Sequence, residues 1–181
     1  QERAKLRKYL LDGGTICFDS VVGSPYFLNS ALRELQQLIP ESPVRRVPAD
    51  HPVFRMVHHI DKISTNTESD IPPELHGIYV GSRLAAVISP YGMGVGWDNL
   101  TPALIPNAKY CKRQSSMELG INIIAYAIGW TESGRAFATP QHSGGDDSAN
   151  PDHLVFAQIK TTGTWNSDPG AESRFLRQLA K

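Results

Sequence analysis

The sequence has little cysteine, no net charge and no long apolar run, and each absence excludes a class of protein. Two cysteines among 181 residues cannot form a disulfide framework, so the chain must rely on a hydrophobic core. Lys plus Arg and Asp plus Glu both number 18, a balance that argues against a nucleic-acid partner. The longest apolar stretches fall short of the ~20 residues that a membrane span needs. We therefore expect one globular domain, or one domain with an appendage, and no membrane span in this segment.

Familiar catalytic and ligand-binding motifs are also missing. There is no GxSxG nucleophile elbow, and the glycine-rich segment YGMGVGWD matches neither a P-loop nor a dinucleotide-binding fingerprint. His51 and His58 lie near each other in sequence, but neither HExxH nor a cysteine–histidine spacing accompanies them. We predict no metal and no cofactor. Cys17 lies in the apolar run TICFD and is expected to be buried.

Hydrophobic periodicity predicts helices alternating with strands. Helices are predicted over residues 2–12, 26–39 and 115–128, with a further helix opening at Asp168-Pro169. Strands are predicted over 15–20, over 76–90 as two strands joined by a turn at Gly81-Ser82, and over 153–160. This alternation predicts an α/β fold with three α/β/α layers, its sheet mostly parallel with an antiparallel hairpin at the edge.

Two long polar segments interrupt this pattern. Residues 40–76 are rich in proline and are expected to form a loop with a short extended piece around 53–57. Residues 130–152 contain almost no large apolar residue and are expected to be a linker. The predicted organisation is an α/β portion over 1–129, the linker over 130–152 and a strand and helix over 153–181.

A binding site is expected where strands end, because ligands of open α/β sheets bind at the carboxyl ends of the strands. The candidates are polar or aromatic residues that follow the first strand or the hairpin, together with two residues within the long loop before the hairpin. They are Asp19, Ser20, Asp50, His51, Tyr91, Trp97 and Asp98. Each also has a structural interpretation. Asp19 and Ser20 would cap a turn, Asp50 would form an Asx turn before Pro52, and the glycine-rich loop would pack with Trp97 turned inward.

Four segments of the chain resemble a known family when read in order: LRKYLLDGGTICFD, VPADHPVFRMVHHI, LHGIYVGSRLAAVISPYGMGVGWD and ELGINIIAYAIG. They look like the bacterial family called domain of unknown function 4159, over residues 2–129. The resemblance implies a flavodoxin-like three-layer domain related to the class I glutamine amidotransferase-like folds. It implies no known activity, and it favours an exported or membrane-anchored parent protein.

The resemblance also leads to an expectation about the tail. The family's usual opening pattern appears at residues 156–180, as FAQIKTTGTWNSDPGAESRFLRQLA, rather than before residue 1. Either the chain is a segment of a tandem array in which residues 153–181 open a second copy, or it is a permuted domain in which this strand lies beside residues 15–19. The tandem alternative predicts an exposed sheet edge near residues 15–20 and self-association through it.

Two functions remain open at this stage. The first is a non-catalytic binding or scaffold module whose partner is a small molecule or a protein. The second is a hydrolase or amidotransferase-like enzyme that uses Asp19, His51, Tyr91 and Asp98 at the carboxyl ends of the strands. The first is favoured, because the family's paired acidic residues are replaced here by Asp19-Ser20 and no nucleophile can be assigned. The enzyme requires Asp19, His51 and Asp98 to lie in one pocket.

Overall fold

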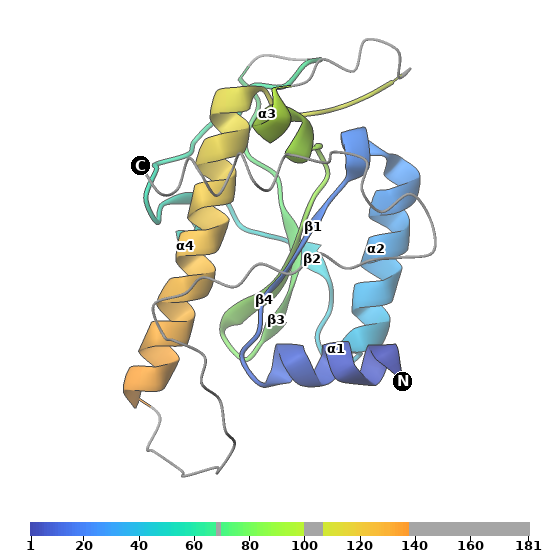
Figure 1. Cartoon of the computed structure of the whole chain (residues 1–181), viewed down its shortest axis with the longest axis vertical. Helices are drawn as coiled ribbons and strands as arrows, with labels where there is room; N and C mark the ends of the chain where they lie inside the picture. Colours follow the sequence, from blue (N-terminus) through green and yellow to red (C-terminus); the bar gives the residue numbers. More distant parts are fainter. Residues whose placement is uncertain (68–69, 100–106, 138–181) are drawn as a thin grey trace.

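The computed structural model describes residues 1–67, 70–99 and 107–137 (Figure 1). The elements, in chain order, are helix α1 (Glu2–Leu11), strand β1 (Ile16–Asp19), 3-10 helix η1 (Val21–Gly23), helix α2 (Pro25–Leu38), strand β2 (Arg45–Arg46), 3-10 helix η2 (Pro52–Phe54), strands β3 (His76–Val80) and β4 (Arg83–Ser89), and helices α3 (Gly94–Asp98) and α4 (Arg113–Phe137). The fold is α/β, as predicted.

The described strands form one mixed sheet in the order β1-β4-β3-β2. β1 runs parallel to β4, whereas β4 with β3 and β3 with β2 are antiparallel. The prediction of a mostly parallel sheet with the hairpin at its edge is therefore corrected for these strands, because the β3–β4 hairpin lies at the centre. The physical reason is that β4 contributes buried side chains to the clusters on both faces of the sheet, which suits a strand that is paired on both sides.

The hairpin turn follows the sequence prediction. Gly81 has a φ of +62°, a left-handed conformation that glycine adopts without the steric penalty of a side chain. From Leu84 to Ser89 every residue of β4 is buried. The pairing with β3 shifts at Ile78/Tyr79. The turn and the apolar run together fix β4 as the strand on which the other elements assemble.

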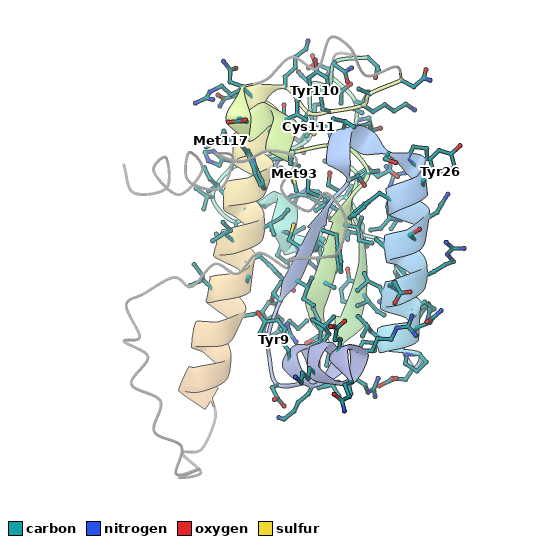
Figure 2. All side chains as sticks on the ribbon, turned by 45° about the vertical axis from the view of Figure 1, so that its right-hand side comes forward. Tyr9, Tyr26, Met93, Tyr110, Cys111 and Met117 are labelled. Atoms are coloured by element: carbon teal, nitrogen blue, oxygen red, sulfur yellow. The ribbon has the colours of Figure 1, made fainter. Side chains whose placement is uncertain are left out.

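One face of the sheet packs against α1 and α2. Their buried side chains, including Leu10, Leu35 and Leu38, form a cluster with Ile78 and Ile88 of the sheet. α2 begins where the sequence places it, because the Ser24 side chain accepts a hydrogen bond from the backbone N–H of Phe27 and Pro25 occupies the first turn. Tyr26 points away from this core on the outer side of α2 and is 84% exposed (Figure 2).

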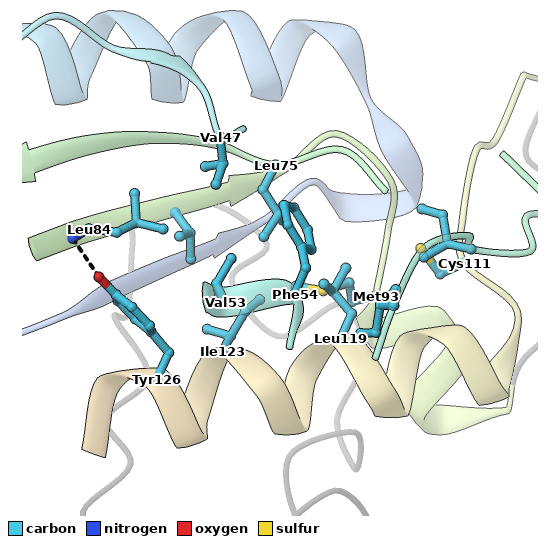
Figure 3. Packing of buried hydrophobic residues seen from close by; sticks show 13 residues of the cluster. Val47, Val53, Phe54, Leu75, Leu84, Met93, Cys111, Leu119, Ile123 and Tyr126 are labelled. Carbon is cyan, nitrogen blue, oxygen red and sulfur yellow. Dashed lines mark hydrogen bonds between the residues drawn. The ribbon is translucent and has the colours of Figure 1, made fainter. Parts of the chain in front are cut away.

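The other face packs against η2 and α4 (Figures 1 and 3). Phe54 of η2 and Leu119 and Ile123 of α4 meet Leu84 and other sheet residues in this cluster. The Tyr126 hydroxyl accepts a hydrogen bond from the Leu84 N–H at 3.1 Å, drawn as a dashed line in Figure 3. α4 is thus attached to the start of β4.

Several local predictions need correction. The extended piece expected around 53–57 is partly the 3-10 helix η2. The glycine-rich segment contains the short helix α3. Cys17, which was expected to be buried, is exposed. α4 continues to Phe137, into the range predicted as linker, and the remainder of the linker and residues 153–181 lie outside the described residues.

None of the helices in the described ranges is long and apolar enough to cross a membrane.

Candidate functional site

The carboxyl ends of the two parallel strands are neighbours, as expected for a site in an α/β fold. Asp19 is paired with Ser89 in the sheet register, and the Ser20 N–H donates to the Ser89 carbonyl at 3.3 Å. The chain that follows each strand therefore starts from the same edge. Met93, Tyr110 and Cys111 lie at this end of the molecule, and Tyr9 lies at the opposite end (Figure 2).

Asp19 holds the start of α3. Its Oδ1 accepts a hydrogen bond from the Met93 N–H at 2.6 Å, and its Oδ2 accepts one from the Gly94 N–H at 2.8 Å. These amides begin a helix and have no partner within it, so a carboxylate satisfies both of them. The contact joins β1 to the glycine-rich segment. Asp19 thus acts here as a cap supplied from a distant part of the chain.

Ser20 lies where the chain after β1 passes close to the chain after β4. Ser20 is fully buried, and its Oγ has no hydrogen-bond partner among the described residues. A Cβ on Gly92 would lie 3.2 Å from the Ser20 carbonyl oxygen and 3.1 Å from the Val22 backbone nitrogen. Val22 has a φ of 45°, an unusual conformation for a β-branched residue. Close approach between the two strand ends explains why glycine is found at position 92.

The segment 109–111 forms hydrogen bonds with both of these chain segments. Lys109 donates its backbone N–H to the Val22 carbonyl at 2.8 Å, and its carbonyl accepts from the Gly92 N–H at 2.9 Å. Cys111 then donates to the Gly92 carbonyl at 3.1 Å. Cys111 is fully buried, and this burial raises the pKa of its thiol to about 12. The thiol is therefore kept neutral and serves as core rather than as a nucleophile.

Tyr91 and Trp97 belong to the same end of the sheet. The Ser89 hydroxyl donates to the Tyr91 carbonyl at 2.6 Å, which fixes the turn after β4. Trp97 is half-buried, and its indole N–H donates to the Ser116 carbonyl at 2.9 Å. Asp98, at the end of α3, is buried. The inward position expected for Trp97 agrees with this contact.

Asp50 and His51 lie elsewhere. The His51 ring is 5.8 Å from the Tyr79 ring and 5.2 Å from the Tyr126 ring, so it lies near the hairpin turn. Tyr79 pairs with Leu84, five residues before Ser89 along β4. At about 3.3 Å per residue, this separates His51 from the Asp19 end by roughly 16 Å along the sheet. Asp50 is exposed.

His51 also has a local structural role. Its Nδ1 accepts a hydrogen bond from the Val53 N–H at 3.1 Å and caps η2. Burial lowers the pKa of His51, and the nearby Asp50 carboxylate opposes this shift. The cap requires an unprotonated Nδ1, so the neutral ring is the form that fits the structure.

Two buried polar residues that were not candidates in the sequence, Ser116 and Asn122, also hold backbone groups in place. The Ser116 hydroxyl donates to the Met93 carbonyl at 2.5 Å, and in the sequence this residue stands out only by its place in the first turn of the helix predicted over 115–128. Asn122 is fully buried in α4; its side chain accepts from the N–H groups of Val57 and His58 and donates to the His58 carbonyl. A polar residue on the apolar stripe of a predicted helix was the available signal for Asn122.

The arrangement brings five of the seven predicted residues to one edge and leaves two at the other end. The residues at the carboxyl edge are Asp19, Ser20, Tyr91, Trp97 and Asp98. Within residues 1–67, 70–99 and 107–137, no group of three or more His, Cys, Asp or Glu side chains could hold a metal ion. The geometry of the edge is that of a braced loop junction, in which a carboxylate and hydroxyl groups bind backbone atoms of the same chain.

Comparison with known proteins gives one family match. Neither a curated protein nor a solved structure matches the chain. The family model described as "Domain of unknown function (DUF4159)" matches residues 1–128, which span both cores and the braced edge. That range is more than two thirds of the 181 residues. The chain therefore belongs to the DUF4159 family.

Proposed function

We propose that this chain is a non-catalytic binding or scaffold module with a flavodoxin-like, three-layer arrangement, part of a larger exported or membrane-associated bacterial protein. The bacterial and exported character comes from the family resemblance. The non-catalytic character comes from the geometry of the candidate residues. The proposed partner is a small molecule or a protein.

One observation carries the proposal: both oxygens of the Asp19 carboxylate bind backbone amides of α3. A general base must reach the proton that it abstracts, and this carboxylate is directed at its own chain. In a hydrolase, His51 would be the partner of this carboxylate. The two are separated by roughly 16 Å along the sheet, which is five residues of β4 at about 3.3 Å each, and the His51 ring accepts a hydrogen bond from the Val53 amide. The burial of Ser20 also disfavours its use as a nucleophile.

The test is a search for an activated serine in the full chain. Wild type, Ser20→Ala and Ser89→Ala would be treated with a fluorophosphonate probe, which labels serines activated by a neighbouring base, and labelling would be mapped by peptide mass. We expect no stoichiometric labelling of any of the three proteins. Labelling of the wild type that disappears in one variant, while that variant keeps its circular dichroism spectrum, would replace the scaffold proposal with a hydrolase.

A further inference from the structure

Residues 51–58 form a strap on the sheet face that α4 covers, and Asn122 of α4 holds its far end. The Asn122 side chain is fully buried. It accepts hydrogen bonds from the N–H groups of Val57 and His58 at 3.0 and 2.9 Å, and it donates one to the His58 carbonyl at 2.8 Å. Because an amide side chain does not titrate, this attachment is independent of pH.

The middle of the strap is held by apolar packing. Val53 and Phe54 of η2 are fully buried in the core on this side, and Figure 3 shows both residues between the sheet and α4. The Phe54 carbonyl also accepts a hydrogen bond from the Ile60 N–H at 2.9 Å. Lifting two such side chains into water would expose a large apolar area at a high cost in free energy. The middle of the strap is therefore a firm anchor.

The start of the strap is held by the His51 ring, and this attachment is titratable. Nδ1 of His51 accepts the Val53 N–H at 3.1 Å, so the neutral ring carries its proton on Nε2. The same ring lies 5.8 Å from the Tyr79 ring of β3 and 5.2 Å from the Tyr126 ring of α4. One half-buried imidazole thus joins the strap to the sheet and to α4.

The groups around this ring disfavour a positive charge on it. Burial lowers the pKa of His51, and the Asp50 carboxylate opposes this shift without reversing it. Two arginines lie on the same aromatic cluster. The Arg45 guanidinium of β2 is 4.6 Å from the centre of the Tyr79 ring, and the charge of Arg83 of β4 interacts with Tyr126. The ring is therefore neutral in the position that the structure shows.

Proton uptake at Nδ1 changes this acceptor into a donor. The protonated ring and the Val53 N–H then direct hydrogens at each other, and the cap of η2 is lost. Since the ring is only half-buried, a change of side-chain rotamer brings its charge into water. Phe54 and Asn122 hold the strap beyond this point, so the change is confined to its first turn.

We propose that protonation of His51 opens the first turn of the strap, residues 51–53, while Phe54 and Asn122 keep the remainder attached. The pKa of the folded ring is lowered, so the turn is closed at neutral pH and opens as the pH falls below about 6.5 toward the folded pKa. Opening brings water to the sides of the Tyr79 and Tyr126 rings that faced His51. This pH-sensitive switch does not depend on the proposed function.

The test is amide hydrogen exchange of the full chain, measured by NMR at pH 7.5 and pH 5 and expressed as protection factors, which remove the pH dependence of the intrinsic rate. The Val53 N–H should lose protection by about tenfold at pH 5, the factor that corresponds to one hydrogen bond. The N–H groups of His58 and Ile60, which report on the two anchors, should keep theirs within about twofold.

Two variants serve as controls. His51→Asn retains an acceptor for the Val53 N–H but does not titrate, so Val53 protection should be the same at both pH values. His59→Asn removes an exposed histidine of the same loop and should respond to pH as the wild type does. If His51→Asn fails to fold, the wild type still decides. The pH midpoint of the Val53 amide shift must then equal that of the His51 ring signals and differ from that of His59.

Three outcomes would overturn the proposal. Unchanged Val53 protection at pH 5 would show that the turn stays closed. An equal loss at Val53, His58 and Ile60 would show that the strap or the whole protein opens as one unit. A loss at Val53 that persists in His51→Asn would assign the response to another group.

Discussion

The Gly94 amide nitrogen lies 2.8 Å from Oδ2 of Asp19, although 75 residues separate them in sequence. The Met93 amide is held by the other oxygen of the same carboxylate. One side chain thus fixes the position of α3 relative to β1. Asp19 was a candidate site residue in the sequence, whereas α3 was not predicted as a helix. The contact therefore joins an expected residue to an unexpected element.

Removing the Asp19 carboxylate should destabilise the protein. Hydrogen bonds to charged groups contribute about 1.5–3 kcal/mol, so Asp19→Ala should lower the free energy of unfolding by about 2–3 kcal/mol. Asp19→Asn keeps one acceptor and should lose less. Urea denaturation measures both. Asp50→Asn, at an exposed aspartate, is the matched control and should leave the midpoint unchanged. Wild-type stability of Asp19→Ala would show that the α3 amides find other partners.

Two serines at the strand ends should behave oppositely. The Ser20 Oγ is buried without a hydrogen-bond partner among the described residues, so Ser20→Ala should be neutral or stabilise the fold by up to about 1 kcal/mol. The Ser89 Oγ donates to the Tyr91 carbonyl, so Ser89→Ala should cost about 1 kcal/mol. Thermal unfolding of both variants checks the contrast. A loss for Ser20→Ala as large as that for Ser89→Ala would contradict it.

Glycine should be required at position 96 but not at position 129. A Cβ on Gly96 would lie 2.6 Å from the Ser116 Cβ and 2.7 Å from the Cys111 carbonyl oxygen, so Gly96→Ala should cost about 1–3 kcal/mol through overpacking. A Cβ on Gly129 would lie 3.4 Å from the flexible end of Met56. Gly129→Ala in α4 should therefore gain up to about 1 kcal/mol from helix propensity. Equal unfolding midpoints for the two variants would contradict the close packing around α3.

Stability should fall as the pH drops below 7. The folded pKa of His51 is lowered by burial, so the unfolded chain takes up a proton at this residue before the folded chain does. The stabilising contribution is present above the unfolded pKa of about 6.5 and is lost as the pH falls from there toward the folded pKa. Urea denaturation at pH 7.5 and pH 5 would measure the loss.

His51→Asn provides the control for this pH effect. An asparagine oxygen can accept the Val53 N–H in an Asx-type turn, as the His51 Nδ1 does, but it does not titrate. The variant should therefore fold and show a smaller loss of stability between pH 7.5 and 5 than the wild type. The same loss in both proteins would place the pH dependence at another group.

The sequence indicated the regular elements better than their arrangement. The helix predicted over 26–39 and the paired strands over 76–90 follow from local signals, namely an apolar stripe and a glycine turn, and the structure confirms these elements. The hairpin as a whole was wrongly predicted at the edge because its place depends on which strands pair at long range, although the apolar run LAAVIS of its second strand indicated a central strand. α3 was missed because three glycines disfavour a helix locally, whereas the distant Asp19 carboxylate stabilises its start.

The candidate site was predicted in part for a similar reason. Parallel strands bring their carboxyl ends together, so Asp19 and the residues after Ser89 were correctly expected at one edge. His51 was grouped with them because no signal in sequence positions a long loop. Its location near Tyr79 and Tyr126 follows from packing of η2 on α4.

The contacts of Arg83 join elements that are far apart in sequence, which bears on the order in which they form. Its guanidinium binds carbonyls of Leu10 and Gly14, respectively 73 and 69 residues earlier in the chain. The β3–β4 hairpin forms from neighbouring residues, but β1 has no partner in the described sheet until β4 exists. Contacts this distant in sequence slow folding. Within the described sheet, β1 therefore pairs only after the segment that contains residues 83–89 has been synthesised, and chaperone binding is best sought in that interval.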